Sequence, residues 1–438
     1  MSFAPRFAGA ASAPMRVGVF RADATPEIGE PLIWVTPATH IDDPLWAKGV
    51  VIEDGGRRFV LCALDWCGIG NSTHQLFRTK IAEAAGTDIG HVMVQTLHQH
   101  TAPYIDGDAY AIMRKLPKHP LLMSDAFLAR VTDRLATSVR ESLKQMQPFD
   151  SIGTGQGRVE RVASARRITG SDGKQITRYS TGGKDAKMAA LPEGDIDPLV
   201  RTVTLASAGK PLVRLHYYAT HPQTWCCDGK VSGDVVSTAR AALERDEQIP
   251  QVYFTGCSGD VTVGKYNDGT EQAKSGLSER LAQGMRTAVR STKYAAVGPV
   301  RWRPVDLTLT PKTQPHADTV PALEAAIKSG RLDDVALYRA AINLAFSRRT
   351  RPLPAASLEI GNVSILHLPG EPMREFQRYA VGLRPDRFVA VAGYGDIAPG
   401  YLCTDRAMSE GGYEPGAANA GPGVEAALKQ AIRKLLDG

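Results

Sequence analysis

Short apolar runs rich in β-branched residues alternate with segments of helical period along most of the chain. An apolar run of a few residues that is bounded by polar or turn residues is typical of a buried strand. We therefore expect buried strands at 58–65, 91–97, 211–219, 251–256, 362–368 and 387–393.

The segments between these runs have apolar residues at the spacing of an amphipathic helix. They predict helices at 71–86, 125–146, 233–246, 275–292 and 319–346, and Asn71 and Asp125 are suitable N-cap residues. Strands that alternate with helices favour an α/β (α+β) fold with large mixed β-sheets covered by helices. No repeat and no Pro/Ser-rich linker divides the chain, so we expect one domain over 1–438, with 1–15 as a disordered N-terminal segment.

Composition narrows the class of protein further. Of 438 residues, 43% are hydrophobic and 22% charged, which excludes a disordered or collagen-like chain. No apolar run approaches the roughly 18–20 residues of a membrane-spanning helix. The net charge of +6 is spread along the chain, and its densest basic cluster, "SRRTR" at 347–351, is typical of a solvated helix end. The sequence thus predicts no nucleic-acid partner and no transmembrane segment.

The six cysteines do not form a disulfide framework. Cys62 lies in an apolar run and is expected to be buried, whereas Cys226 and Cys227 are adjacent, and we expect no bridge between them because that geometry is strained. The N-terminus lacks a charged region followed by an apolar stretch. The compartment therefore stays open: cytoplasmic, or periplasmic or secreted if a leader precedes this chain.

Polar residues collect just after several of the predicted strands. These positions are His98 and His100 after 91–97, His221 after 211–219, Glu371 after 362–368, and "YGDIAPGYLCTD" (394–405) after 387–393. Ligands in sheet proteins gather outside strand ends, which favours one shared site. Taken singly, each residue has another interpretation. His98 and His100 could cap a strand, and His221 could stabilise a loop by hydrogen bonding. Glu371 could be a carboxylate at a helix N-terminus that is stabilised by the helix dipole.

Six ordered motifs resemble the N-terminal catalytic domain of the neutral/alkaline (non-lysosomal) ceramidases, a family of zinc-dependent amidases. The resemblance spans nearly the whole chain, without the immunoglobulin-like C-terminal domain of that family. It is carried by "VGVFRADATPEIG" (17–29), "VQTLHQHTAP" (94–103), "GDIDPLVRTVTL" with "HYYATHP" (194–222), "GCSGDVTVGKYN" (256–267), "ILHLPGE" (365–371) and "GYLCTDRAMSEGGYEPGAA" (400–418).

The resemblance implies a role for each matched position. It makes four residues ligands of zinc (Zn²⁺): His98, His221, Glu371 and Tyr401. It also makes His100 the general acid/base and places Tyr413 facing the developing oxyanion. Imidazole and carboxylate are ordinary zinc ligands, a zinc-bound water is an effective nucleophile, and an amide nitrogen needs an acid to leave.

Two departures from the family bear on the substrate. Thr262 stands where the family has a serine beside the substrate, and Val263-Gly264 replaces the residues after it. Thr262 takes over the position of this catalytic candidate, but its added methyl group favours attack by a zinc-bound water over attack by a side-chain hydroxyl. The family's arginine-bearing segment corresponds only loosely to "ASARRITGSDG" (163–173), from which Arg166 or Arg167 is expected to face the site. These departures, with the missing C-terminal domain, put ceramide in doubt as the substrate.

We therefore expect a zinc-dependent hydrolase that cleaves an amide (N-acyl) bond of a small molecule by attack of a zinc-bound water. The alternatives are ester or lactone hydrolysis, or a lyase reaction on a sugar-like polyol, at the same metal site. A Ser258 hydrolase is a weaker alternative because Asp260 stands where the GxSxG elbow has glycine. A binding protein without activity is disfavoured because every expected ligand is present.

Overall fold

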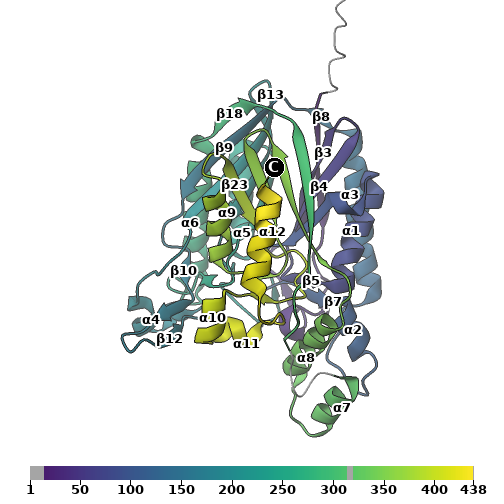
Figure 1. Cartoon of the computed structure of the whole chain (residues 1–438), viewed down its shortest axis with the longest axis vertical. Coiled ribbons are helices and arrows are strands. Elements are labelled where there is room, and N and C mark those ends of the chain that lie inside the picture. Colours follow the sequence, from purple (N-terminus) through teal and green to yellow (C-terminus); the bar gives the residue numbers. More distant parts are fainter. Residues whose placement is uncertain (1–13, 313–318, 438) are drawn as a thin grey trace, which may run out of the picture.

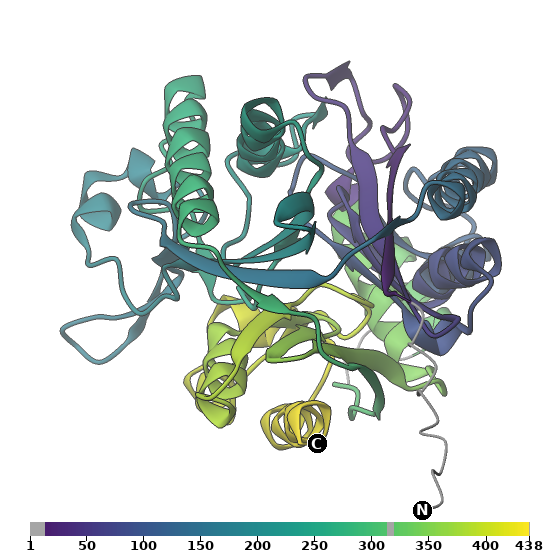
Figure 2. The same cartoon turned by 90° about the horizontal axis from the view of Figure 1, so that it is seen from above.

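The computed structural model describes residues 14–312 and 319–437. Three larger β-sheets in these residues each carry helices on their outer face, as seen from above in Figure 2. Figure 1 labels their elements along the chain. This arrangement confirms the predicted mixed sheets covered by helices. The N-terminal residues 1–13 of the expected disordered segment lie outside the described residues.

The first sheet has the strand order β6-β4-β3-β1-β8, with only the β4–β6 pair parallel. Helices α1 (Asn71–Ala85) and α3 (Asp125–Lys144) cover its outer face. Its strands are β1 (Arg16–Asp23), β3 (Trp46–Asp54), β4 (Arg57–Leu64), β6 (Val92–Thr96) and β8 (Gln147–Pro148).

The second sheet has the order β16-β14-β13-β9-β18 and lies under α5 (Asp234–Glu247) and α6 (Glu271–Arg290). Glycines of β9 let α6 approach closely, because a Cβ at Gly157 would overlap the Gly284 carbonyl. The strands are β9 (Ser151–Arg158), β13 (Leu199–Ser207), β14 (Lys210–Tyr218), β16 (Gln251–Thr255) and β18 (Lys293–Ala296).

The third sheet, β19-β20-β21-β23, is covered by α9 (Arg374–Leu383) and α12 (Val424–Leu436). Its strands are β19 (Val300–Leu307), β20 (Leu353–Ile360), β21 (Val363–His367) and β23 (Phe388–Ala392). The inner faces of all three sheets share one apolar core, which joins Leu61 of β4, Leu215 of β14 and Ile365 of β21. Period-2 alternation sends their neighbours, such as Cys62, to the helix-covered face.

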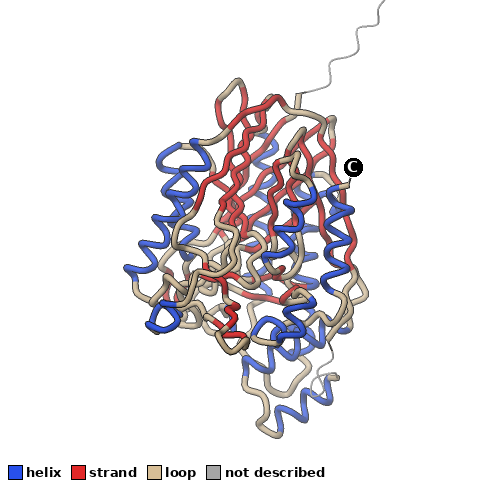
Figure 3. The backbone as a smooth tube through the Cα atoms, turned by 60° about the vertical axis from the view of Figure 1, so that its left-hand side comes forward, coloured by secondary structure: helices blue, strands red, loops and turns tan. Residues whose placement is uncertain are grey.

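Shorter elements gather at one end of the sheets, where the loops also collect (Figure 3). The short strands are β2 (His40–Ile41), β5 (Gly68–Gly70), β7 (Tyr104–Asp106), β10 (Ser164–Ala165), β11 (Arg167–Thr169), β12 (Gln175–Thr177), β15 (Lys230–Val231), β17 (Val261–Thr262), β22 (Glu371–Pro372) and β24 (Tyr401–Leu402). The remaining α-helices are α2 (Gly107–Met113), α4 (Ala186–Ala190), α7 (Val320–Lys328), α8 (Asp334–Ser347), α10 (Asp405–Glu410) and α11 (Tyr413–Ala417). Three 3₁₀ turns are η1 (Ile33–Val35), η2 (Ile89–His91) and η3 (Gly182–Lys184). None of the described helices is long and apolar enough to cross a bilayer.

The predicted strands are all found, each to within one or two residues at either end. The helix expected over 319–346 is instead two helices, α7 and α8, because the chain turns at Gly330 with φ of 68°. Both N-cap assignments are wrong by one residue. Gly70 precedes α1, and the Asn71 side chain bonds Asp106 and Arg349 instead. Ser124 caps α3 by accepting from the Phe127 N–H.

Two further expectations are corrected by tertiary contacts. Arg349, in the basic cluster after α8, is not merely solvated, because it forms a buried ion pair with Asp396 at 2.8 Å. Cys226 and Cys227 are joined by a disulfide, against the expectation. The backbone at Cys227 has a φ of 65°, which turns both side chains to the same side of the loop. Cys62 is buried, as predicted.

Candidate metal centre and cavity

The predicted metal ligands follow strands that pair in parallel within their sheets. His98 comes two residues after β6, His221 three after β14, and Glu371 four after β21. The carboxyl ends of these strands point to the same end of the molecule, so loops from three different sheets meet there. His98 itself has a φ of 69°, so the backbone turns sharply as the chain leaves β6.

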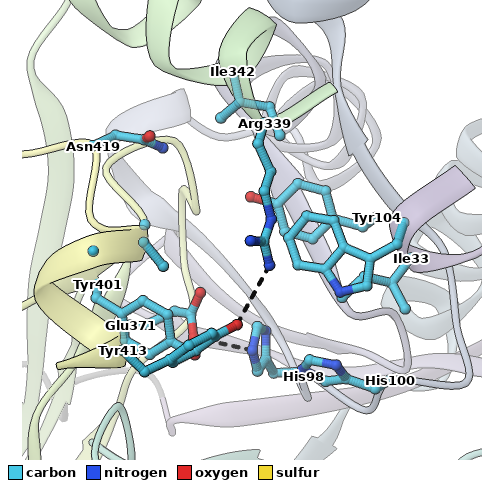
Figure 4. Close-up of a pocket in the computed structure, with 14 residues that line it drawn as sticks. Ile33, His98, His100, Tyr104, Arg339, Ile342, Glu371, Tyr401, Tyr413 and Asn419 are labelled. Atoms are coloured by element: carbon cyan, nitrogen blue, oxygen red, sulfur yellow. Dashed lines mark hydrogen bonds and ion pairs between the residues drawn. The ribbon is translucent and has the colours of Figure 1, made fainter. Parts of the chain in front are cut away.

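Three buried atoms converge at this meeting point, and Figure 4 draws two of the residues that carry them, His98 and Glu371. The Nε2 atoms of His98 and His221 lie 3.1 and 3.3 Å from the same carboxylate oxygen, Oε2 of Glu371. The two imidazole rings stand edge to face, with 4.7 Å between their centroids. Residues more than 120 positions apart in sequence thus present their ligating atoms to one point.

Backbone carbonyls hold both imidazoles by their other nitrogen. His98 Nδ1 lies 2.8 Å from the Cys67 carbonyl, and His221 Nδ1 lies 2.7 Å from that of Ser258. A carbonyl only accepts, so each Nδ1 carries the proton and each Nε2 is left with a lone pair. The two Nε2 atoms and Glu371 Oε2 have no hydrogen-bond partner among the described residues.

Lone pairs on two nitrogens facing a carboxylate oxygen repel one another unless a positive charge lies between them. Burial lowers the pKa of His221 to about 3, so this ring stays neutral. Burial also opposes a charge on His98, but the Glu371 carboxylate raises the pKa of His98 well above its usual value. A proton on His98 Nε2 and a metal ion are therefore alternative ways to neutralise the site. His98, His221 and Glu371 could hold a metal ion.

Cys67, His98 and His100 form a second group of potential ligands. Burial raises the pKa of the Cys67 thiol, which disfavours the thiolate that a metal would need. The Nδ1 atom of His98 faces Cys67 and already forms a hydrogen bond with the Cys67 backbone carbonyl. The first group is therefore the better metal site.

His100 lies beside the metal ligands with a different hydrogen-bond pattern. The Gln223 amide donates to His100 Nδ1 at 3.0 Å, so the proton of the neutral ring is on Nε2. Nε2 is buried and has no partner among the described residues. Burial and the neighbouring imidazoles lower the pKa of His100 well below its usual value. The structure therefore leaves an N–H of a neutral imidazole next to the three residues that could hold a metal ion.

Tyr401 reaches the same cavity because β22 and β24 pair in parallel, which places it opposite Glu371. Its hydroxyl accepts from Arg166 Nη1 at 2.8 Å, and the Tyr413 ring lies 5.8 Å from the Tyr401 ring. Arg167 turns away and pairs with carboxylates outside the cavity. Of the two candidate arginines, Arg166 is thus the one that faces the site.

The cavity beside these residues has a volume of about 90 Å³. It is lined by residues of η1, α8 and α11, the helix that carries Tyr413 (Figure 4). Its lining residues are Ile33, Trp34, His98, His100, Tyr104, Arg339, Ile342, Glu371, Gly400, Tyr401, Tyr413, Gly416, Ala417 and Asn419.

Thr262 and Ser258 are not among these lining residues. Thr262 lies behind His221, to which its backbone is bridged, and its hydroxyl is buried. Ser258 Oγ bonds the Tyr394 hydroxyl at 2.7 Å, whereas His221 Nδ1 faces the Ser258 carbonyl. No described histidine nitrogen is hydrogen-bonded to Ser258 Oγ, so the base that a serine nucleophile needs is not in place.

Sequence reasoning missed four residues of this site. Tyr394 stacks on His98, Gln223 orients His100, and Trp34 and Arg339 form the cavity wall opposite the metal ligands. Tyr394 and Gln223 each lie within three residues of a motif residue or a strand end, but nothing in the sequence shows which way they point. Trp34 and Arg339 lie outside every motif, so only the fold shows that they reach the cavity.

No sequence-family model matches this chain, and no curated protein matches it. Among solved structures, the neutral ceramidase from Pseudomonas aeruginosa superposes with a TM-score of 0.72 and 17% sequence identity, covering 96% of this chain and 74% of that one. The fold is that of a ceramidase. A ceramidase complexed with C2 gives a TM-score of 0.71 at 18% identity, with the same coverage of each chain. The resemblance seen in the six sequence motifs is thereby confirmed for the fold.

Proposed function

We propose that this chain is a zinc-dependent hydrolase of an amide (N-acyl) bond, related to the neutral ceramidases but with a different substrate. The observation that carries the proposal is the convergence of three buried, unpartnered atoms: Nε2 of His98, Nε2 of His221 and Oε2 of Glu371. Catalytic zinc is usually held by imidazole nitrogens and a carboxylate, with each imidazole fixed by a hydrogen bond from its other nitrogen to a carbonyl or carboxylate oxygen. The ceramidase fold supports the same reading.

His98, His221 and Glu371 would hold the zinc, with Tyr401 as a fourth ligand. When bound, zinc supplies a Lewis acid that polarises a carbonyl and lowers the pKa of a water ligand to about 7. The carbonyls of Cys67 and Ser258 fix the two imidazoles for that task.

The remaining residues bind the substrate and move protons. His100 lies beside the proposed ligands, where it would first take the proton of the attacking water and then deliver that proton to the departing amine nitrogen, which is a poor leaving group without it. To accept that proton on Nε2, the neutral ring would carry its own proton on Nδ1, with the Gln223 side-chain oxygen turned toward Nδ1. The neutral ring is restored when the amine leaves. Tyr413 would donate a hydrogen bond from its hydroxyl to the oxygen that becomes negative. Arg166 fixes the Tyr401 phenol at 2.8 Å.

Metal removal tests this proposal. We expect one zinc per chain by elemental analysis, and we expect exhaustive dialysis against a strong chelator to abolish activity on a panel of N-acyl amides. Added zinc should restore that activity. His98→Ala should lose the metal, whereas His40→Ala, which removes an exposed histidine, should keep it. Undiminished amide hydrolysis after complete chelation would refute the proposal.

A further inference from the structure

The cavity has a cationic group at the end opposite the metal ligands. Arg339, on α8, directs its guanidinium into the cavity (Figure 4). Its Nη2 lies 3.4 Å from the Tyr413 hydroxyl, to which it donates. Among residues 14–312 and 319–437, no carboxylate lies within ion-pair distance of Arg339. Arg166 does not line the cavity and is already bonded to Tyr401.

The indole of Trp34 holds this guanidinium in place. The Arg339 Cζ lies over the Trp34 ring, 4.1 Å from its centroid. Trp34 and Val35 both have a positive φ, of 55° and 57°, which is strained for residues with a side chain. The Ile33 N–H bonds the Ala102 carbonyl at 2.9 Å, which ties this strained turn to the segment just after His100. Stacking fixes the plane of the guanidinium and leaves most of its N–H donors free.

The other polar groups at this end of the cavity do not neutralise the charge. Both ends of the Asn419 amide are taken, with Nδ2 donating to the Ala398 carbonyl and Oδ1 accepting from Asn343. Glu371, the one carboxylate in the lining, is held by the two imidazoles. The fork of a fixed guanidinium matches the two oxygens of a carboxylate.

The size of the cavity limits what else the ligand contains. Its volume of about 90 Å³ is small beside the roughly 300–1,000 Å³ of pockets for drug-sized ligands. Tyr413 lies between the two ends, because its ring meets the Tyr401 ring edge to face and its hydroxyl accepts from Arg339. A bound molecule can therefore place an amide at the metal ligands and an anionic group at Arg339 at the same time.

We propose that Arg339 and Trp34 form a carboxylate subsite and that the substrate is a small N-acylated amino acid. This inference rests on the proposed function. In the reaction, the amide C–N bond breaks, a C–O bond forms with water, and the products are a carboxylic acid and a free amino acid. The proton lost by the water ends on the leaving nitrogen by way of His100. Water is the only co-reactant.

Binding of a ligand that cannot be hydrolysed tests the subsite without relying on activity. Methanesulfonylglycine has a carboxylate but no scissile carbonyl, and its carboxamide is the neutral counterpart. We expect calorimetry on the zinc-loaded chain to show the acid binding about tenfold or more tighter than the carboxamide, as charged hydrogen bonds do. Arg339→Gln should remove this difference. Arg348→Gln makes the same charge change at the exposed end of α8 and should not.

Hydrolysis gives a second readout. We expect wild-type kcat/KM for N-acetyl amino acids to exceed that for their carboxamides at least tenfold, with Arg339→Gln losing the preference mainly through KM. Equal binding of the acid and the carboxamide to wild-type protein would overturn the subsite, even if amides are cleaved. Tight binding of the acid without hydrolysis of any amide would instead support the subsite and refute the proposed function.

Discussion

The phenol ring of Tyr394 lies nearly flat against the imidazole of His98, with 4.5 Å between centroids and 27° between planes. Its hydroxyl bonds Ser258 Oγ at 2.7 Å and lies 3.3 Å from His221 Nδ1. One side chain therefore contacts two of the proposed zinc ligands. Tyr394 is a positioning residue for the metal site, because it packs against one imidazole and fixes the surroundings of the other.

Two substitutions of Tyr394 should weaken metal binding to different extents. Tyr394→Phe keeps the stacked ring and should weaken zinc binding less than tenfold, whereas Tyr394→Leu removes the stack and should weaken it by about 10–100-fold, as outer-shell changes do. Competition with a chelating dye measures both values. Tyr294→Leu, at an exposed tyrosine of β18, is the control. Wild-type affinity in a folded Tyr394→Leu protein would contradict this role.

His100 and His98 should respond differently to the same change. His100→Ala should retain one zinc per chain and lose about 10²–10⁴-fold in kcat, since it removes the acid/base but no ligand. His98→Ala should lose the metal. Elemental analysis and steady-state kinetics on the same preparations separate the two roles. Loss of zinc from His100→Ala would make His100 a ligand and contradict its assignment.

Asp106 should give stability a pH dependence unrelated to the metal site. Burial raises the pKa of Asp106 to about 7, against the hydrogen bond from the Ala109 N–H, and Asp396 adds to the rise. The unfolded chain loses this proton near pH 4, so the folded state binds more protons between about pH 4 and 7. The contribution of Asp106 to stability is therefore greatest at low pH and is lost as the pH rises to 7.

Asp106→Asn removes this titration but keeps a capping side chain for α2. Relative to wild type, we expect the variant to gain up to about 3 kcal/mol of unfolding free energy between pH 4.5 and pH 7. Urea unfolding at several pH values measures the difference. Asp108→Asn, two residues along the same helix and partly exposed, should show no comparable trend. A constant difference between Asp106→Asn and wild type would contradict the prediction.

Because α6 packs closely on the second sheet, we expect alanine substitutions at two glycines to change the unfolding free energy in opposite directions. Gly157→Ala would place a Cβ against the Gly284 carbonyl and should cost about 1–3 kcal/mol of unfolding free energy through overpacking. Gly382→Ala meets nothing within 4 Å on α9 and should stabilise by up to about 1 kcal/mol. The midpoint temperature of thermal unfolding should fall for Gly157→Ala and rise for Gly382→Ala. A neutral Gly157→Ala would show that α6 can move outward.

Local pattern predicted the elements well where the pattern was strong. The strand at 362–368 and the helix at 71–86 were found because burial imposes an unbroken apolar run on one and a helical period on the other. Strand β9 was not predicted because its glycines interrupt the alternation of apolar and polar residues. These glycines are needed for the close approach of α6. The single helix over 319–346 was wrong because Gly330 interrupts a period that continues on both sides.

The sequence by itself determined the class of fold, mixed β-sheets covered by helices, and several residues that meet at one end of the sheets, because the polar residues after strand ends lie in short motifs. The arrangement of the strands in three larger sheets was decided by the tertiary structure. His98, His221 and Glu371 were each found this way, and the structure brings them together. Only the tertiary structure decided that Arg166 rather than Arg167 bonds Tyr401 of the cavity, and that Arg339 is part of the cavity lining. The direction of a side chain and the meeting of distant segments depend on how sheets and helices pack, and no local pattern encodes that.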